Sequence, residues 1–194
     1  LLTSSFFKIN DYILIMFVQT ENTPNPNSLK FLPGKVVSNH GSFHITNKHE
    51  TNNELIRNLL SVNGVKEIFL GQDFISINKQ DDIDWDEIKH IVISLINDFY
   101  SSGRENVIDK SLNENSIDLN DLEKKIVKIL EEKIRPAVAK DGGDIKFKEF
   151  KNGVVKVELQ GSCSGCPSST MTLKQGVQNL LCHYLPEVKE VEAV

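Results

Sequence analysis

A polar stretch near the middle of the chain, GRENVIDKSLNENSI (103–117), sets the strongest limit on how these 194 residues can fold. The stretch is charged and weakly periodic, which is typical of a linker rather than of a packed core. The segments on either side of it each contain helix and strand patterns with their own apolar faces. We therefore expect an α+β protein with two small domains, at residues 16–102 and 118–194, joined by a flexible linker at 103–117.

The first domain is expected to combine short strands with two helices. The segment TPNPN (23–27) lies between two of these strands, and its prolines fix φ and favour a rigid turn. Contact with a partner is the alternative role for this turn. Residues 65–70 and 74–77 read as a hairpin, and Asp84 is a candidate N-cap for the long helix that follows.

The second domain reads as helix, strand, strand, cysteine loop, helix, strand. Asp118 or Asn120 is expected to cap its first helix, and Pro136 to stop or kink that helix. The run DGGD (141–144) is expected to shape the turn into the next strand, with its glycines supplying positive φ. Partner recognition is the alternative role for this loop. The remaining elements are expected at 145–150, 154–161, 167–184 and 188–194.

Charge and composition limit the partners. The net charge of −5 gives no basic excess, which argues against nucleic acid and against an anionic membrane surface. No apolar run approaches the roughly 20 residues that span a bilayer. Residues 1–15 precede Met16 and make a poor targeting peptide. We expect them to be a non-native extension or a disordered arm, with Met16 as the natural start.

The segment GSCSGCPSS (161–169) carries the most chemistry. Pro167 fits the first helical position, which makes Cys166 the expected N-cap. A helix N-terminus carries partial positive charge, so Cys163 and Cys166 are expected to ionise more readily than a free cysteine with a pKa of about 8.5. Thiolates in such a loop suit soft metals and iron–sulfur clusters.

Three kinds of site are compatible with one CxxC pair. A closed zinc site within one chain is disfavoured, because the sequence has three cysteines and no second ligand pair near the first. A thioredoxin-like redox pair is the second possibility. The third is a cluster shared by two copies, in which two thiolates per chain make a four-cysteine set. Cys182 lies nearly opposite the expected buried stripe of its helix, which includes Tyr184, and is expected to be an incidental thiol facing solvent or a partner.

Long motifs, rather than the cysteine pair alone, resemble a known family. RPAVAKDGGDIKF (135–147), GSCSGCPSSTMTLKQGVQNLL (161–181) and PEVKEVEAV (186–194) resemble the C-terminal domain of NifU, as found in Nfu-type iron–sulfur carriers. FVQTENTPNPNSLKFLPGK (17–35) and GVKEIFLGQDFISINK (64–79) resemble the N-terminal domain of the same carriers. The likeness covers nearly the whole chain from Met16.

The resemblance implies a carrier or scaffold rather than an enzyme. It implies a 4Fe–4S cluster bridged between two protomers by Cys163 and Cys166, and delivery of that cluster to apo iron–sulfur proteins. Upstream assembly proteins are expected as further partners, and a homodimer as the cluster-bound form. A bacterial cytoplasm is the expected location, with the mitochondrial matrix as the alternative. The competing function is a thiol–disulfide oxidoreductase.

Overall fold

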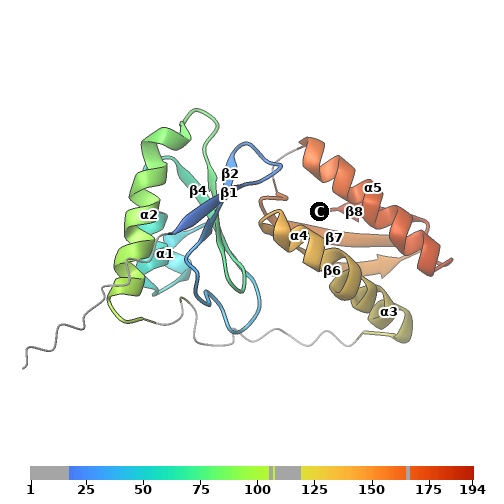
Figure 1. The fold of residues 1–194 in the computed structure, drawn as a ribbon. Coiled ribbons are helices and arrows are strands. Elements are labelled where there is room, and N and C mark those ends of the chain that lie inside the picture. Colours follow the sequence, from blue (N-terminus) through green and yellow to red (C-terminus); the bar gives the residue numbers. More distant parts are fainter. Residues whose placement is uncertain (1–17, 105–106, 108–118, 165–166) are drawn as a thin grey trace, which may run out of the picture.

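The computed structural model describes residues 18–104, 107, 119–164 and 167–194. Within these ranges the chain forms two sheets, each with helices packed against it (Figure 1). Residues 18–104 with Val107 are called the N-terminal unit, and residues 119–194 the C-terminal unit. The predicted α+β class is confirmed. The predicted extension at 1–15 lies outside the described residues.

The N-terminal unit is built on a five-stranded sheet in the order β1-β2-β5-β4-β3, with every neighbouring pair antiparallel. Figure 1 shows helices α1 and α2 on the side of this sheet away from the C-terminal unit. The elements are β1 (Gln19–Asn22), β2 (Ser28–Leu32), β3 (Phe43–Ile45), the 3-10 turn η1 (Lys48–Glu50), α1 (Glu54–Leu59), β4 (Val65–Leu70), β5 (Ile75–Lys79) and α2 (Trp85–Ser101).

Local sequence accounts for these elements. Asp84 caps α2, as predicted, in a capping box with Glu87 that satisfies free N–H groups of the first turn. Alternate residues of the strands point to the helices, so Phe31, Ile77 and Ile68 lie in one core with Ile96 of α2. TPNPN forms the turn between β1 and β2, as the sequence predicts.

The C-terminal unit has a three-stranded sheet in the order β6-β7-β8. β6 and β7 form an antiparallel hairpin, while β8 runs parallel to β7 because α5 carries the chain back across the sheet. Its core includes Ile126, Val138, Val155 and Val177. The elements are α3 (Asp121–Ile129), η2 (Leu130–Ile134), α4 (Arg135–Lys140), β6 (Gly143–Lys151), β7 (Val154–Gly161), α5 (Pro167–Tyr184) and β8 (Glu190–Ala193).

The first helical segment of this unit is irregular at its centre. Asn120 caps it, and the Asn120 side chain accepts from the N–H groups of Leu122 and Glu123. The helix then passes through the π-helical turn η2 and resumes as α4, with Pro136 in its first turn. Proline lacks an N–H donor, so the regular hydrogen-bond ladder is interrupted at this point. The predicted stop at Pro136 is wrong, because the helix continues as α4, and where a kink was the other expectation the structure has a π-helical turn.

The C-terminal end of α5 differs from the prediction, although Val177 and Leu181 are buried as the helix period predicts. Cys182 is half-buried and packs against the core, whereas Tyr184 is 52% exposed. The Gln178 side chain, one turn before Cys182, accepts a hydrogen bond from Val191 N at 3.1 Å. The returning strand β8 therefore covers the side of α5 that was expected to face solvent, while Tyr184 at the helix end extends beyond the core.

The predicted domain boundaries stay a prediction, because most of the proposed linker lies outside the described residues. Val107, within that segment, packs into the core of the N-terminal unit. In the described part of the chain, no helix has the length and apolar character that a membrane span requires.

Candidate functional site

The cysteine loop leaves the sheet at Gly161, the last residue of β7. Gly161 has φ of +67°, a conformation that glycine adopts without strain. The hydroxyl of Ser164 lies 2.7 Å from Gly161 O, and Ser164 N donates to the same carbonyl at 3.1 Å. The chain therefore turns tightly at Cys163. Helix α5 begins at Pro167, as predicted, whereas Cys166 lies outside the described residues.

Cys163 is buried, with 6% of its surface exposed. It packs with the core of the C-terminal unit, and its Sγ lies 3.9 Å from Ser162 Oγ. Ser162 Oγ in turn donates to Asp141 O, which ties the cysteine loop to the end of α4. A Cβ placed on Gly143 would lie 2.7 Å from Cys163 Sγ, so the sulfur sits directly on a glycine backbone.

The ionisation of Cys163 is opposite to the prediction. Burial raises the pKa of its thiol to about 11, against a smaller lowering by the Ser162 hydrogen bond, and the carboxylates of Asp141 and Asp144 raise it further. Desolvation and neighbouring negative charge both disfavour a thiolate. Cys163 in this conformation is therefore a protonated thiol, contrary to the expected acidification, because burial and the two carboxylates raise its pKa.

The DGGD loop supports the cysteine loop from the side. Asp144 is buried, and its carboxylate accepts two hydrogen bonds from the Arg135 guanidinium, at 2.8 and 2.7 Å. Gly142 has φ of +82°, as expected for the turn. Gly143 does not have positive φ, contrary to the prediction. Its lack of a side chain is needed instead for the close approach of Cys163 and of Gln160 O.

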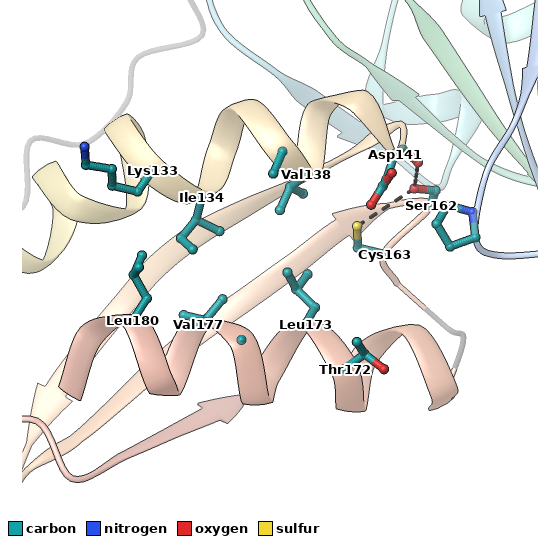
Figure 2. Close-up of a pocket in the computed structure, with 13 residues that line it drawn as sticks. Lys133, Ile134, Val138, Asp141, Ser162, Cys163, Thr172, Leu173, Val177 and Leu180 are labelled. Carbon is teal, nitrogen blue, oxygen red and sulfur yellow. Dashed lines mark hydrogen bonds between the residues drawn. The ribbon is translucent and has the colours of Figure 1, made fainter. Parts of the chain in front are cut away.

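A cavity of about 590 Å³ opens beside Cys163. Figure 2 shows it between the helical segment that carries Ile134 and Val138 and the helix that carries Leu173 and Val177. Cys163, Ser162 and Asp141 lie together at one end. The side walls of the cavity, which the two helices form, are mostly apolar. Pro24 of the N-terminal unit also lines the cavity.

Residues of the N-terminal unit, which the sequence did not indicate as site residues, contact the cysteine loop. Asn25 Nδ2 donates to Ser162 O at 3.1 Å and to Ser164 O at 3.2 Å. Glu67 Oε1 lies 2.8 Å from Ser164 Oγ. The available signal was the polar TPNPN turn, whose alternative role was contact with a partner.

No group of three or more His, Cys, Asp or Glu side chains that could hold a metal ion occurs in the described ranges. Cys163 is the one predicted ligand that these ranges include. The pairing of Cys163 with Cys166 as ligands therefore remains a prediction.

Two family models match the chain. The model described as "NifU-like domain" matches residues 126–192, and the one described as "Scaffold protein Nfu/NifU N terminal" matches residues 18–103. A protein of Arabidopsis thaliana named "NifU-like protein 5, mitochondrial" is 43% identical over 185 residues, which cover 91% of this chain and 67% of the relative. This chain belongs to the Nfu-type family of NifU-like proteins. The predicted family is confirmed.

Other relatives give similar figures. "NifU-like protein 4, mitochondrial" of Arabidopsis thaliana is 44% identical, over 91% of this chain and 65% of the relative. "NFU1 iron-sulfur cluster scaffold homolog, mitochondrial" of Drosophila ananassae is 45% identical, over 92% of this chain and 64% of the relative. This Nfu-type chain therefore spans about two thirds of the length of the curated relatives it matches.

Proposed function

We propose that this chain is an iron–sulfur cluster scaffold or carrier. The observation that carries the proposal is the position of the cysteine loop, between β7 and α5, within the segment matched by the NifU-like domain model. A relative that is 45% identical is named an iron-sulfur cluster scaffold homolog. The cluster is cargo, which the protein receives and passes on, so the chain is proposed to be a non-catalytic protein.

We further propose that Cys163 and Cys166 bind a 4Fe–4S cluster shared with a second copy of the chain. Four thiolates complete the ligand set of such a cluster, and one cysteine loop supplies two of them. A two-fold axis through the cluster would bring the second loop to the same site. Cys163 is buried in the structure, so this loop must open before its sulfur can reach a cluster.

We propose that this protein receives the cluster from upstream assembly proteins. It then delivers the cluster to its clients, which are apo iron–sulfur proteins. A cluster bound at a subunit interface is exposed, so its thiolate ligands can be replaced by those of a client. Such a site suits cluster transfer better than permanent cluster storage. We place the protein in the mitochondrial matrix, because three relatives at 43–45% identity are named mitochondrial. These names do not support the bacterial cytoplasm that the sequence led us to expect.

Anaerobic reconstitution with ferrous iron and sulfide tests the proposed function. The expected product has the broad visible absorption of a 4Fe–4S cluster, and Cys163→Ala or Cys166→Ala abolishes it. Cys182→Ala is the matched control and should load like the parent. Loading that survives both single substitutions would overturn the proposal, as would insulin reduction that needs both cysteines and no iron.

A further inference from the structure

On its strands β2 and β5, the outer face of the N-terminal sheet is polar and yet buried. Along β2 and β5, the residues that point away from α1 and α2 alternate with core residues, as a pleated strand requires. In an antiparallel sheet such a polar face is ordinarily solvated. Here it is covered, and Ser76 is 1% and Asn78 5% exposed. Buried polar side chains ordinarily have hydrogen-bond partners. Asn78 Nδ2 has one in the cysteine loop, whereas Ser76 Oγ and Asn78 Oδ1 have none among the described residues.

Two loops of the C-terminal unit cover this face, and they approach it with glycine backbone. A Cβ on Gly142 would lie 2.6 Å from Ser76 Oγ, and a Cβ on Gly161 would lie 2.8 Å from the ring of Phe69. Side chains at these two positions would push the units apart. The covering segments are 141–144 and 161–164, and Figure 1 shows the end of the C-terminal unit at which α4 and β7 end lying against the N-terminal sheet.

Three of the hydrogen bonds across this contact end on main-chain carbonyls of the cysteine loop, and others join Lys30 to Lys140 O and Ser42 to Asp144. Asn25 donates to Ser162 O and Ser164 O, and Asn78 Nδ2 donates to Gly161 O at 3.0 Å. Glu67 adds a contact to the Ser164 hydroxyl at 2.8 Å. Because three of these acceptors are backbone atoms, the N-terminal unit binds one conformation of the loop, with the Ser164 hydroxyl as a side-chain contact beside them.

This conformation is one in which Cys163 is withdrawn. Cys163 is buried, and Pro24 of the same TPNPN turn lines the cavity next to it. We propose that Asn25, Glu67 and Asn78 form a docking surface for the chain's own cysteine loop, and that this docking and the binding of a cluster shared with a second copy exclude each other. The N-terminal unit holds carbonyls and a hydroxyl of residues 161–164. These residues flank the Cys163 sulfur, which must be free to bind the cluster that the two copies share.

The docking is tested on the full chain without iron. In a Cys166→Ser, Cys182→Ser background, Cys163 is the single thiol, and its alkylation rate at pH 8 reports how often the loop opens. Asn25→Asp keeps the acceptor for Asn27 N but replaces two donors with an oxygen that faces two carbonyls. Loss of these two hydrogen bonds predicts alkylation faster by on the order of tenfold or more.

Asn27→Asp is the matched control, because Asn27 lies in the same turn and bonds to Asp81 and Lys79 rather than to the cysteine loop, and the Lys79 ammonium can pair with the new carboxylate. It should alkylate at the parent rate. An Asn25→Asp rate equal to that of the parent would overturn the proposal. The single tryptophan, Trp85, donates to Pro26 O and reports by its fluorescence whether the turn is intact. If Asn25→Asp disrupts the turn, Asn78→Ala replaces it, because it removes a donor to Gly161 O and leaves the cysteine loop's own hydrogen bonds in place. A severalfold faster rate is expected, and a parental rate would contradict the docking.

The exclusion rests on the proposed function and has its own readout. With Cys163 and Cys166 both present, Asn25→Asp should take up iron and sulfide faster than the parent, and Asn27→Asp at the parent rate. If Asn25→Asp is alkylated faster than the parent but takes up iron and sulfide at the same rate, the cysteine loop does dock on the N-terminal unit, but docking does not exclude cluster binding. No cluster in any variant, with the alkylation difference intact, would reject the proposed function and the exclusion while the docking stands.

Discussion

Glu67 and Ser164 join the two units of the chain, with Oε1 of the carboxylate 2.8 Å from the hydroxyl of the residue that follows Cys163. The same carboxylate accepts from Asn78 and pairs with Nε2 of His44 at 3.1 Å. Burial pushes the pKa of Glu67 upward, but the hydrogen bonds from His44, Ser164 and Asn78 outweigh it and lower the pKa to about 2. Glu67 is therefore an anion held by three donors at the contact.

Replacing Glu67 by glutamine should lower the free energy of unfolding at pH 6 to 7. The depressed pKa means that the charged carboxylate stabilises the fold above its ordinary pKa of 4.5, and that this contribution is lost as the pH falls through about 2. We expect a loss of about 1–2 kcal/mol, allowing for screening by solvent. Urea denaturation of parent and Glu67→Gln at pH 6.5 and pH 3 measures it.

The pH dependence separates this cause from a general loss of packing. The difference in free energy of unfolding between the parent and Glu67→Gln should be smaller at pH 3, because part of the stabilisation by the charged Glu67 carboxylate is then lost. A gap that is the same at both pH values would show that the charge of Glu67 is not what stabilises the contact.

The thiol of Cys163 should react slowly with iodoacetamide at neutral pH. Its pKa is raised to about 11 by burial and by Asp141 and Asp144, so the thiolate fraction is small at pH 7 and rises about tenfold per pH unit up to pH 10. Mass spectrometry of the Cys163 peptide in a Cys166→Ser chain, against a free cysteine peptide, measures this. A plateau below pH 9 would contradict the raised pKa.

Gly143 should be intolerant of any side chain. A Cβ there would lie 2.5 Å from Gln160 O and 2.7 Å from Cys163 Sγ, and backbone cannot move aside cheaply. We expect Gly143→Ala to lower the free energy of unfolding by about 2 kcal/mol or more. Gly176→Ala is the control, since a Cβ there meets nothing within 4 Å and alanine favours the helix by about 1 kcal/mol. Equal effects of both substitutions, in thermal or urea unfolding, would contradict this packing.

Arg135→Lys should destabilise the C-terminal unit. A lysine cannot reproduce the paired hydrogen bonds at 2.8 and 2.7 Å to the buried Asp144 carboxylate. The expected loss is about 2 kcal/mol, measured by urea unfolding at pH 7. Lys156→Gln breaks an exposed pair with Glu149 and should have little effect. If the Arg135→Lys chain were as stable as the Lys156→Gln chain, the paired hydrogen bonds from Arg135 to Asp144 would not be needed for stability.

Much of the fold could be predicted because its signals are local. Asp84 and Asn120 are capping residues, and both cap helices where the sequence places them. The hairpin around Gly71–Asp73 and the helix start at Pro167 follow from turn and proline chemistry in the same way. The Nfu-type family could be predicted because long motifs, such as residues 161–181, resemble those of its members.

The environment of the candidate site could not be predicted, because it depends on contacts between distant segments. Helix periodicity could not show that Cys182 would pack against the core of the C-terminal unit. Proximity to a helix end suggested an acidic Cys163, but burial against Gly143 and two nearby carboxylates reverse the sign. The contact of Asn25 with Ser162 joins residues 137 positions apart, and no local pattern encodes it.

The mass of the loaded protein tests the shared cluster most directly. Native mass spectrometry of the anaerobically reconstituted chain should give a species of two chains with one 4Fe–4S cluster, which returns to single chains when the cluster is chelated. The Cys163→Ala chain should remain cluster-free under the same conditions. A single chain that holds a complete 4Fe–4S cluster, or a dimer that loads equally without Cys163, would contradict the proposal that each chain carries half of the site.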